Sequence, residues 1–506
     1  MRNALVLGAI LVAALLVRSI GFSWGDDFPG GFRGHHVDEW THVVIAGTLI
    51  NPKVPPRWHP QPYPKGLAAH VAVPFLVSRA ATGRLFDTRL PSDEALIKTA
   101  RAISIAYGVL AVAVLWWIAR RLCDDVRAAH FTALCLALAP LAVMQSHFGL
   151  ADSPALFWSL AAAALLYADI EDRRRGALGA AAFAVGMAVG FKLTPWLLPS
   201  LFLVAVSQPS RIGRLAATIG GCVAGFAVCT FLSMSPFDVV KCFVGDSVTP
   251  PDLLDPRDFP RLYAIEVLPS FTVPALLLAA AGIPALFRPS RHAWFIGVAI
   301  AIPAVLHIAC ALPKLAPFPR HLLPLLPALA LLFGAAAVRS KIHGITAMIA
   351  VGYLAFATLA TERRFDDDPR SHVRAHLRAS LPQGATVHWP AYEKELAEDG
   401  FSPAAFPAEK VPDVIVAESW RTNHWLSGTG PRDSRPKDYR RVFDGMSAAH
   451  LEAWQALYDD PARFSKKVGR RFDVDRPLPE DRMADALLGD RSRTYVGDVL
   501  IFVNAR

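Results

Sequence analysis

Long apolar runs separated by short polar connections fill the first 360 residues of the chain. A helix needs about 20 mostly apolar residues to cross the hydrocarbon core of a bilayer, and most of these runs approach that length. They predict eleven membrane-spanning helices, at 4–21, 101–119, 129–148, 154–170, 176–193, 195–207, 212–233, 264–287, 293–312, 321–338 and 342–360. We therefore expect an α-helical polytopic membrane protein.

One further apolar stretch, at 67–81, has only about 15 residues, which is short for a crossing. It also contains His70, Pro74 and Arg79. We expect a helix that lies along the membrane surface or re-enters the membrane. If this stretch crossed instead, the orientation of every later span would be reversed.

Basic residues mark every second connection between the predicted spans, and such loops face the cytoplasm under the positive-inside rule. They are Arg120-Arg121, Arg173-Arg174-Arg175, Arg211 with Arg214, Arg288 with Arg291, and Arg339 with Lys341. The long connections 22–100 and 234–263 then lie on the outer side. An odd number of crossings places everything from Glu362 onward on that side as well.

The character of the sequence changes after residue 361. Alternating apolar and polar residues predict strands there, and two segments have helical spacing. The strands are expected at 385–389, 411–417, 467–474 and 496–503, and the helices at 372–381 and 447–458. The predicted organisation is a membrane domain over 1–361, which includes the first outer loop 22–100, followed by a small α/β domain with a mixed sheet over 362–506.

Composition and charge agree with this class. Hydrophobic residues make up 53% of the chain, which exceeds the apolar content of soluble proteins. The net charge of +9 arises in 1–361, because 362–506 carries 23 Lys and Arg against 24 Asp and Glu. A basic membrane domain suits anionic lipids or a phosphate-bearing lipid substrate. No soluble basic stretch is interleaved with aromatic residues, so a nucleic-acid partner is not expected. The six cysteines form no CxxC metal pattern.

Two histidines and two acids gather after the first span, at His35, His36, Asp38 and Glu39. Acidic residues at the outer mouth of a polytopic protein are costly near lipid and usually functional. A partly shielded Asp38 carboxylate can act as a general base toward a sugar or protein hydroxyl. The alternatives are a divalent metal held by His35 or His36 with Glu39 and a distant ligand, or loop charges that face water.

A second acidic residue, Asp152, lies at the outer end of one predicted span, and Pro154 opens the next. Topology places Asp152 in the same compartment as Asp38, so two carboxylates can meet at one site. The position of Asp152 also suits the N-cap of a helix that begins at Pro154. The two roles are compatible.

Cations form a third group on the outer side. Arg101 opens the second span, Lys192 interrupts an apolar stretch between two spans, and the tenth span opens with Arg320 and His321. Each side chain taken alone can snorkel to the membrane interface. Several on one side of the membrane indicate a receptacle for a lipid phosphate.

Taken in order, these short motifs resemble the GT-C superfamily of polytopic glycosyltransferases. The nearest likeness is to bacterial relatives of protein O-mannosyltransferases and of the aminoarabinose transferases that modify lipid A. The resemblance covers about 1–360, and its order along the chain matters more than any single motif. Its pieces are Arg18 near the end of the first span, Asp38-Glu39, Tyr63-Pro64-Lys65-Gly66-Leu67, Arg101-Ala102-Ile103-Ser104, Asp152, Gly190-Phe191-Lys192 and Arg320-His321-Leu322-Leu323-Pro324.

The resemblance implies an inverting enzyme at the periplasmic face of a bacterial inner membrane. It would transfer a sugar from a polyprenyl-phosphate donor to a hydroxyl of a lipid, glycan or protein acceptor. Asp38 would be the base, Glu39 its neighbour that shapes the site, and Asp152 an orienting group. The candidates for holding the donor phosphate are Lys65, Arg101, Lys192, Arg320 and His321. A transporter or flippase, or a ligase of lipid-linked glycans, is the alternative, although no two-fold hydropathy repeat supports a transporter.

Overall fold

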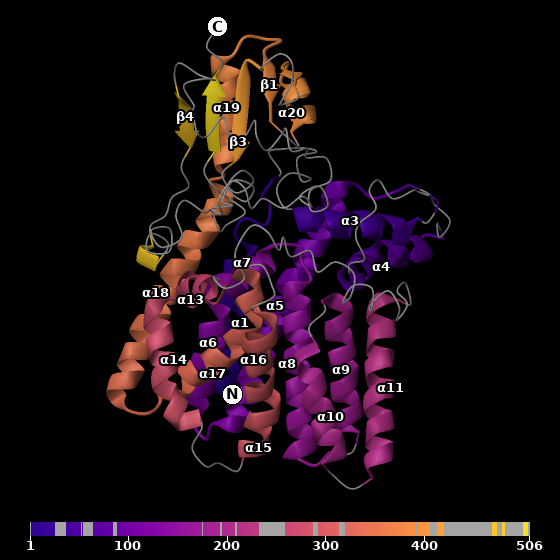
Figure 1. The fold of residues 1–506 in the computed structure, drawn as a ribbon, viewed down its shortest axis with the longest axis vertical. Coiled ribbons are helices and arrows are strands. Elements are labelled where there is room, and N and C mark those ends of the chain that lie inside the picture. The colour runs from indigo at the N-terminus through magenta and orange to yellow at the C-terminus, as the bar shows by residue number, and fades with distance from the viewer. Residues whose placement is uncertain are drawn as a thin grey trace, which may run out of the picture.

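A computed structural model of the chain shows two parts, a bundle of helices and a small sheet that stands beyond one end of it (Figure 1). Helix α18 (Lys341–Asp366) leads from the bundle toward the sheet. The structure describes residues 2–25, 37–51, 53, 64–83, 89–174, 176–192, 195–207, 210–231, 259–286, 292–312, 319–389, 392–404, 412–418, 468–472, 478–480 and 499–503.

Helices account for the apolar runs of the sequence. Besides α18, the bundle contains α1 (Arg2–Ser19), α5 (Asp93–Leu122), α6 (Val126–Ala137), α7 (Pro140–His147), α8 (Asp152–Ile170), α9 (Ala177–Phe191), α10 (Leu198–Val206), α11 (Arg211–Thr230), α13 (Phe259–Phe271), α14 (Val273–Leu286), α15 (Ala293–Ile296), α16 (Ile302–Leu306) and α17 (Leu326–Ala337). In the part of the chain that is described, seven helices are long and apolar enough to cross a membrane, or nine if each of two bent pairs is one span. The polytopic helical class is confirmed, while the count of eleven spans stays a prediction.

Two predicted spans are bent rather than straight. The run at 129–148 is divided into α6 and α7, which meet at 53°, because Pro140 cannot continue the hydrogen-bond ladder of α6. The run at 264–287 is divided into α13 and α14, which meet at 102°. The bend falls at Thr272, whose φ of 64° lies in the left-handed region. Hydropathy alone shows neither bend.

Two helices of the first outer segment, α3 (Val37–Ile50) and α4 (Gly66–Ala81), lie at the end of the bundle that faces the sheet (Figure 1). The helix expected at 67–81 is therefore confirmed, and Figure 1 shows it beyond the ends of α9 and α11 rather than alongside them. Its first half is buried against the bundle and its second half is mostly exposed, as expected of a helix at a surface.

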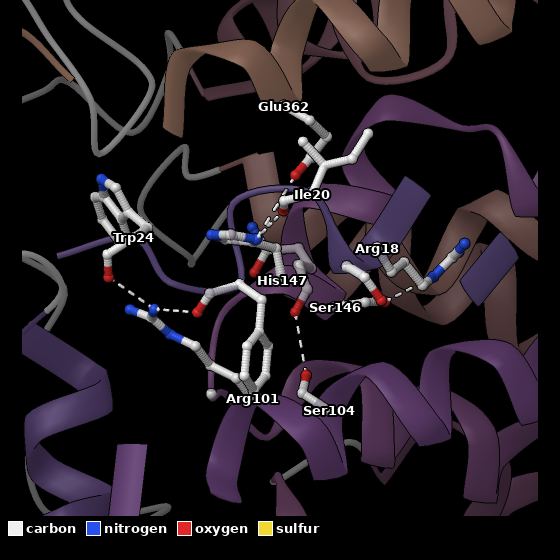
Figure 2. Close-up of polar contacts among 12 residues, drawn as sticks. Arg18, Ile20, Trp24, Arg101, Ser104, Ser146, His147 and Glu362 are labelled. Atoms are coloured by element: carbon white, nitrogen blue, oxygen red, sulfur yellow. Dashed lines mark hydrogen bonds and ion pairs between the residues drawn. The ribbon is translucent and has the colours of Figure 1, made fainter. Parts of the chain in front are cut away.

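Arg18 is buried at the break between α6 and α7. A broken helix leaves carbonyl groups without partners in its own ladder, and a membrane interior supplies none. Arg18 Nη1 donates to Ala137 O at 2.8 Å, and Arg18 Nε donates to Ser146 Oγ at 3.2 Å (Figure 2). The arginine that ends the first span thus ties α1 to both halves of the bent pair and fixes the end of α7.

The tail contains a mixed five-stranded sheet with the strand order β2-β1-β3-β5-β4. Its elements are α19 (Pro369–Ser380), β1 (Thr386–His388), α20 (Glu393–Glu398), β2 (Ser402–Pro403), β3 (Val414–Glu418), β4 (Val468–Phe472) and β5 (Val499–Val503). The four predicted strands and the helix predicted at 372–381 are confirmed. Elements as short as β2 and α20 show no periodicity that a sequence pattern can reveal. The helix predicted at 447–458 lies outside the described residues.

Candidate active site

A buried ion pair joins the first outer helix to the bundle. Arg101 in α5 donates from Nε to Glu39 Oε1 at 2.9 Å and from Nη2 to Glu39 Oε2 at 3.0 Å. Both side chains are 0% exposed. Buried charges are tolerated only when the pair is well aligned and the remaining polar atoms are also bonded. The two-point contact between guanidinium and carboxylate meets the first condition.

Backbone groups from two other segments meet the second condition. Arg101 Nη1 donates to the carbonyl oxygens of Phe22 and Trp24 at 2.9 and 2.7 Å, and Figure 2 shows Trp24 beside this guanidinium. Gly149 N donates to Glu39 Oε1 at 2.7 Å. Gly149 must be a glycine here, because a Cβ would lie 2.7 Å from that of Ala100. The ion pair therefore holds the turn after α1, the start of α3, α5 and the α7–α8 connection at one point.

Asp38 precedes Glu39 in the first turn of α3. Its side chain lies outside the described residues, but adjacent Cα atoms are about 3.8 Å apart, so the Glu39 contacts also fix the backbone of Asp38. The shaping role predicted for Glu39 agrees with this geometry. The phosphate-binding role predicted for Arg101 does not, because its guanidinium is buried and bonded to Glu39 and two carbonyl groups. The sequence shows only that Arg101 stands at the start of an apolar run, and that position does not reveal that its side chain is buried.

The metal alternative requires a carboxylate of Glu39 that can reach an ion. Both of its oxygens accept hydrogen bonds from Arg101, and one also accepts from Gly149, so Glu39 does not fit as a ligand. His35 and His36 lie outside the described residues. Within the described ranges, no three His, Cys, Asp or Glu side chains gather closely enough to hold an ion.

Asp152 pairs with Lys192 at the same end of the bundle. Lys192 Nζ donates to Asp152 Oδ1, and the side chains are 23% and 5% exposed respectively. Asp152 is the first residue of α8 and Ala151 is its N-cap, so the predicted capping role is wrong. Asp152 lies three positions after Gly149, whose backbone N–H bonds to Glu39, and that length of chain spans at most about 11 Å. Both acidic motifs therefore converge on one region.

Close backbone packing brings a second lysine to this region. Gly66, which follows Lys65, lies against Gly190, because a Cβ on Gly66 would come within 2.5 Å of Gly190 O. Lys65 at the start of α4 therefore lies beside the turn that carries Lys192.

His70 lies one turn further along α4. Burial lowers the pKa of His70, although its hydrogen bond to the Gly66 carbonyl opposes the shift. His70 is thus neutral at pH 7, and it packs on Phe191.

Arg320 and His321 begin the short helical turn Pro319–Leu325 before α17. The ring of His321 is hydrogen-bonded to the hydroxyl of Tyr263 at 3.0 Å. Its carbonyl oxygen accepts from His307 Nε2 at 2.6 Å, and His307 in turn packs edge-on against Trp196 at 5.4 Å. Trp196 lies four positions after Lys192 in the sequence, so these contacts join His321 to the part of the chain that follows Lys192.

Two residues of this region escaped the sequence analysis. His307 is a buried ionisable residue inside an apolar span. Such a position usually indicates function, and the hydropathy analysis did not consider it. Trp24 gave no signal, because an aromatic residue just outside a span is typical of any membrane interface. Its contacts appear only in the folded chain.

Residues 94–234 match the family model of dolichyl-phosphate-mannose-protein mannosyltransferases. This segment contains Arg101, Asp152 and Lys192, three of the predicted site residues. Over this segment the chain is similar to dolichyl-phosphate-mannose-protein mannosyltransferases. The match agrees with the predicted resemblance to protein O-mannosyltransferases and supports a membrane glycosyltransferase that uses a lipid-linked sugar.

Three solved structures are similar to this chain at low sequence identity. ArnT from Cupriavidus metallidurans bound to undecaprenyl phosphate is 14% identical over 98% of this chain and 97% of its own, with a TM-score of 0.48. The apo oligosaccharyltransferase of Archaeoglobus fulgidus is 12% identical over 95% and 81%, with a TM-score of 0.48. The S. cerevisiae Pmt1-Pmt2 complex bound to the sugar donor is 18% identical over 46% and 34%, with a TM-score of 0.33. No curated protein matches the chain.

Proposed function

We propose that this chain is an inverting glycosyltransferase of the GT-C superfamily. It moves a sugar from a polyprenyl-phosphate donor to a hydroxyl acceptor at the periplasmic face of a bacterial inner membrane. The observation that carries the proposal is the buried Glu39–Arg101 ion pair, which fixes Asp38 at the end of the bundle where Lys65 and Lys192 also lie. In this assignment 1–361 is the catalytic membrane domain and 362–506 a periplasmic domain.

Asp38 is the general base of the proposed reaction. Its carboxylate takes the proton of the acceptor hydroxyl as that oxygen attacks the anomeric carbon of the sugar. The new glycosidic bond forms while the bond from the anomeric carbon to the phosphate oxygen breaks. The polyprenyl phosphate leaves with the electron pair of that bond. Attack from the face opposite the leaving group inverts the configuration at this carbon.

The lysines supply the charge that the departing phosphate needs. A leaving phosphate gains negative charge in the transition state, and fixed cations stabilise it without reorganisation. Lys65 and Lys192 lie beside the same Gly66–Gly190 contact, and Lys192 is 23% exposed, so a phosphate can reach it. Asp152 holds Lys192 through their ion pair, which gives Asp152 an orienting role toward the donor rather than the role of a base.

Purified protein incubated with a panel of radiolabelled polyprenyl-phosphate sugars tests this function. Release or transfer of sugar from one donor, with an inverted product anomer by NMR, is the expected result. Consumption of no donor in the panel would contradict the proposal, and transport of lipid-linked glycans would then be measured. A parallel arm with a chelator decides whether turnover needs a metal ion, because only a metal-dependent enzyme loses turnover there.

Changing Lys192 to Gln is expected to weaken use of the lipid donor. A hydrogen bond to a charged group contributes about 1.5–3 kcal/mol, so the KM for the donor should rise roughly 10- to 100-fold. The measurement is initial rate against donor concentration at saturating acceptor. Arg214→Gln is the matched control, because Arg214 pairs with Asp169 near the other end of α8 at 2.5 Å with nearly equal exposure, 20% and 5%. Equal KM values in the two variants would remove Lys192 from the donor site.

A further inference from the structure

The end of α18 and the start of α19 pack directly on the segment that contacts the Glu39–Arg101 ion pair. Trp24 Nε1 donates to Asp368 Oδ2 at 2.7 Å, and both groups are buried. Asp368 is the N-cap of α19, where its side chain accepts from Arg370 N and pairs with the Arg370 guanidinium. The carbonyl of the same Trp24 accepts from Arg101. The side chain of Trp24 is thus bonded to Asp368 in the tail, and its backbone carbonyl is bonded to Arg101 of the ion pair.

Aromatic packing reinforces this connection. The Phe365 ring of α18 lies edge-on to Trp24 at 5.1 Å and is stacked on His147 at 4.2 Å. His147 at the end of α7 is hydrogen-bonded to Ile20 O at 3.0 Å and lies 3.7 Å from the Glu362 carboxylate (Figure 2). We call Trp24, His147, Phe365, Asp368 and Arg370 the junction cluster.

Close approach of the chain at this point depends on one glycine. Gly21 has a φ of 67°, which only glycine adopts readily, and a Cβ there would lie 2.7 Å from that of Phe365 and 2.9 Å from His147 Cε1. The turn after α1 is therefore shaped to fit the end of α18. Guanidinium carbons from both sides lie near the Trp24 ring, Arg101 at 5.5 Å and Arg370 at 5.2 Å from its centroid. Such cation–π contacts add attraction at each side.

We propose that Trp24 is a positioning residue through which the docked tail sets the geometry of the Glu39–Arg101 pair, and so of Asp38. The inference rests on the proposed function for its kinetic consequence, although the structural link stands by itself. Arg101 uses one nitrogen, Nη1, to bind the 22–24 backbone, and two others to bind Glu39. A shift of Trp24 therefore moves the guanidinium on which Glu39 rests. Misplacement by about 1 Å can cost an enzyme 10²-fold in rate.

Trp24→Phe removes the donor of the interdomain hydrogen bond and keeps an aromatic ring, and Asp368→Asn weakens the acceptor at nearly constant volume, because its one amide oxygen must serve both Trp24 Nε1 and Arg370 N. Each is expected to lower kcat roughly tenfold, with the KM for the donor unchanged, because the bond is made to a charged group and no donor contact is touched. The double variant should lose no more than the worse single variant, since both changes break one interaction. Losses that multiply, or an unchanged kcat, would overturn the proposal.

Trp116→Phe is the matched control. The Trp116 indole also donates to a side chain, His130 Nδ1 at 3.1 Å, but it lies 15 residues along α5 from Arg101, or about 22 Å. This variant should keep the wild-type kcat. A loss of kcat equal to that of Trp24→Phe would show that any lost indole hydrogen bond has the same effect and would contradict the positioning role.

Hydrogen–deuterium exchange of the full-length protein in detergent gives a readout that needs no donor. The amides of α3, residues 37–50, should exchange faster in Trp24→Phe and Asp368→Asn and at the wild-type rate in Trp116→Phe. If wild type consumes no donor, the proposed function fails while this arm still tests the link. Unchanged α3 exchange in both junction variants would refute the link whatever the enzyme transfers.

Discussion

Asp38→Asn is expected to lower kcat with the preferred polyprenyl-phosphate sugar by about 10²- to 10⁴-fold, the usual contribution of a general base. The amide has nearly the same size as the carboxylate but cannot accept the acceptor's proton at neutral pH. The lipid phosphate is expected to contact the lysines instead, so binding of the donor should persist. The measurements are single-turnover sugar transfer and donor binding in the same detergent preparation.

Asp93→Asn provides the control for this change. Asp93 also lies in the first turn of a helix, α5, so both substitutions remove a carboxylate that interacts favourably with a helix dipole. Only Asp38 is proposed to meet the acceptor. Turnover of Asp38→Asn equal to that of Asp93→Asn would contradict the base assignment and leave a binding or transport protein as the better description. Loss of donor binding together with turnover would instead place Asp38 in the donor site.

The sequence predicted the helical class because bilayer thickness imposes a length and an apolar composition on each span. The same rule gave the short helix at 67–81, which α4 matches. Hydropathy could not predict the bend at Thr272, because a left-handed backbone conformation does not change how apolar the surrounding residues are. The strands of the tail were visible through their alternation, and the two-residue β2 was not.

Candidate residues were found by their chemistry, but their roles depended on partners far along the chain. Arg101 and Lys192 look equivalent in the sequence, since each is a cation at the edge of an apolar run. The fold buries Arg101 against Glu39, 62 positions away, and leaves Lys192 partly exposed beside Asp152. Trp24 and Asp368 are 344 positions apart, and no local pattern connects them. Pairwise contacts of this kind exist only after folding, so a single sequence cannot separate a structural cation from a substrate-binding one.

Glu39→Gln and Arg101→Met are each expected to destabilise the protein by about 3–5 kcal/mol, the cost of leaving one member of a buried ion pair uncompensated. Glu39→Gln keeps the shape of the side chain but leaves the Arg101 charge in a site with 0% exposure. Both variants should show a clear fall in Tm and in the yield of folded protein. Thermal unfolding in detergent, followed by intrinsic tryptophan fluorescence, measures the shift.

Glu94→Gln is the control for removal of a charge, and Glu94 lies on α5, the helix that carries Arg101. Glu94 pairs with Lys98 in an exposed i,i+4 contact, with side chains 54% and 29% exposed, and such pairs contribute at most about 1 kcal/mol. Its Tm should stay close to wild type. Equal Tm values for Glu39→Gln and Glu94→Gln would show that the Glu39–Arg101 pair is not buried in the protein.

The double variant Glu39→Leu with Arg101→Met separates stability from geometry. Replacing both charges by apolar side chains removes the uncompensated charge, so folding should recover relative to either single variant. Recovery should be partial, because the Phe22 and Trp24 carbonyls and Gly149 N lose their partners. Turnover should stay low, since the ion pair no longer fixes the first turn of α3 against α5. A double variant that regains both stability and wild-type turnover would mean that the ion pair holds the fold alone and leaves Asp38 where it was.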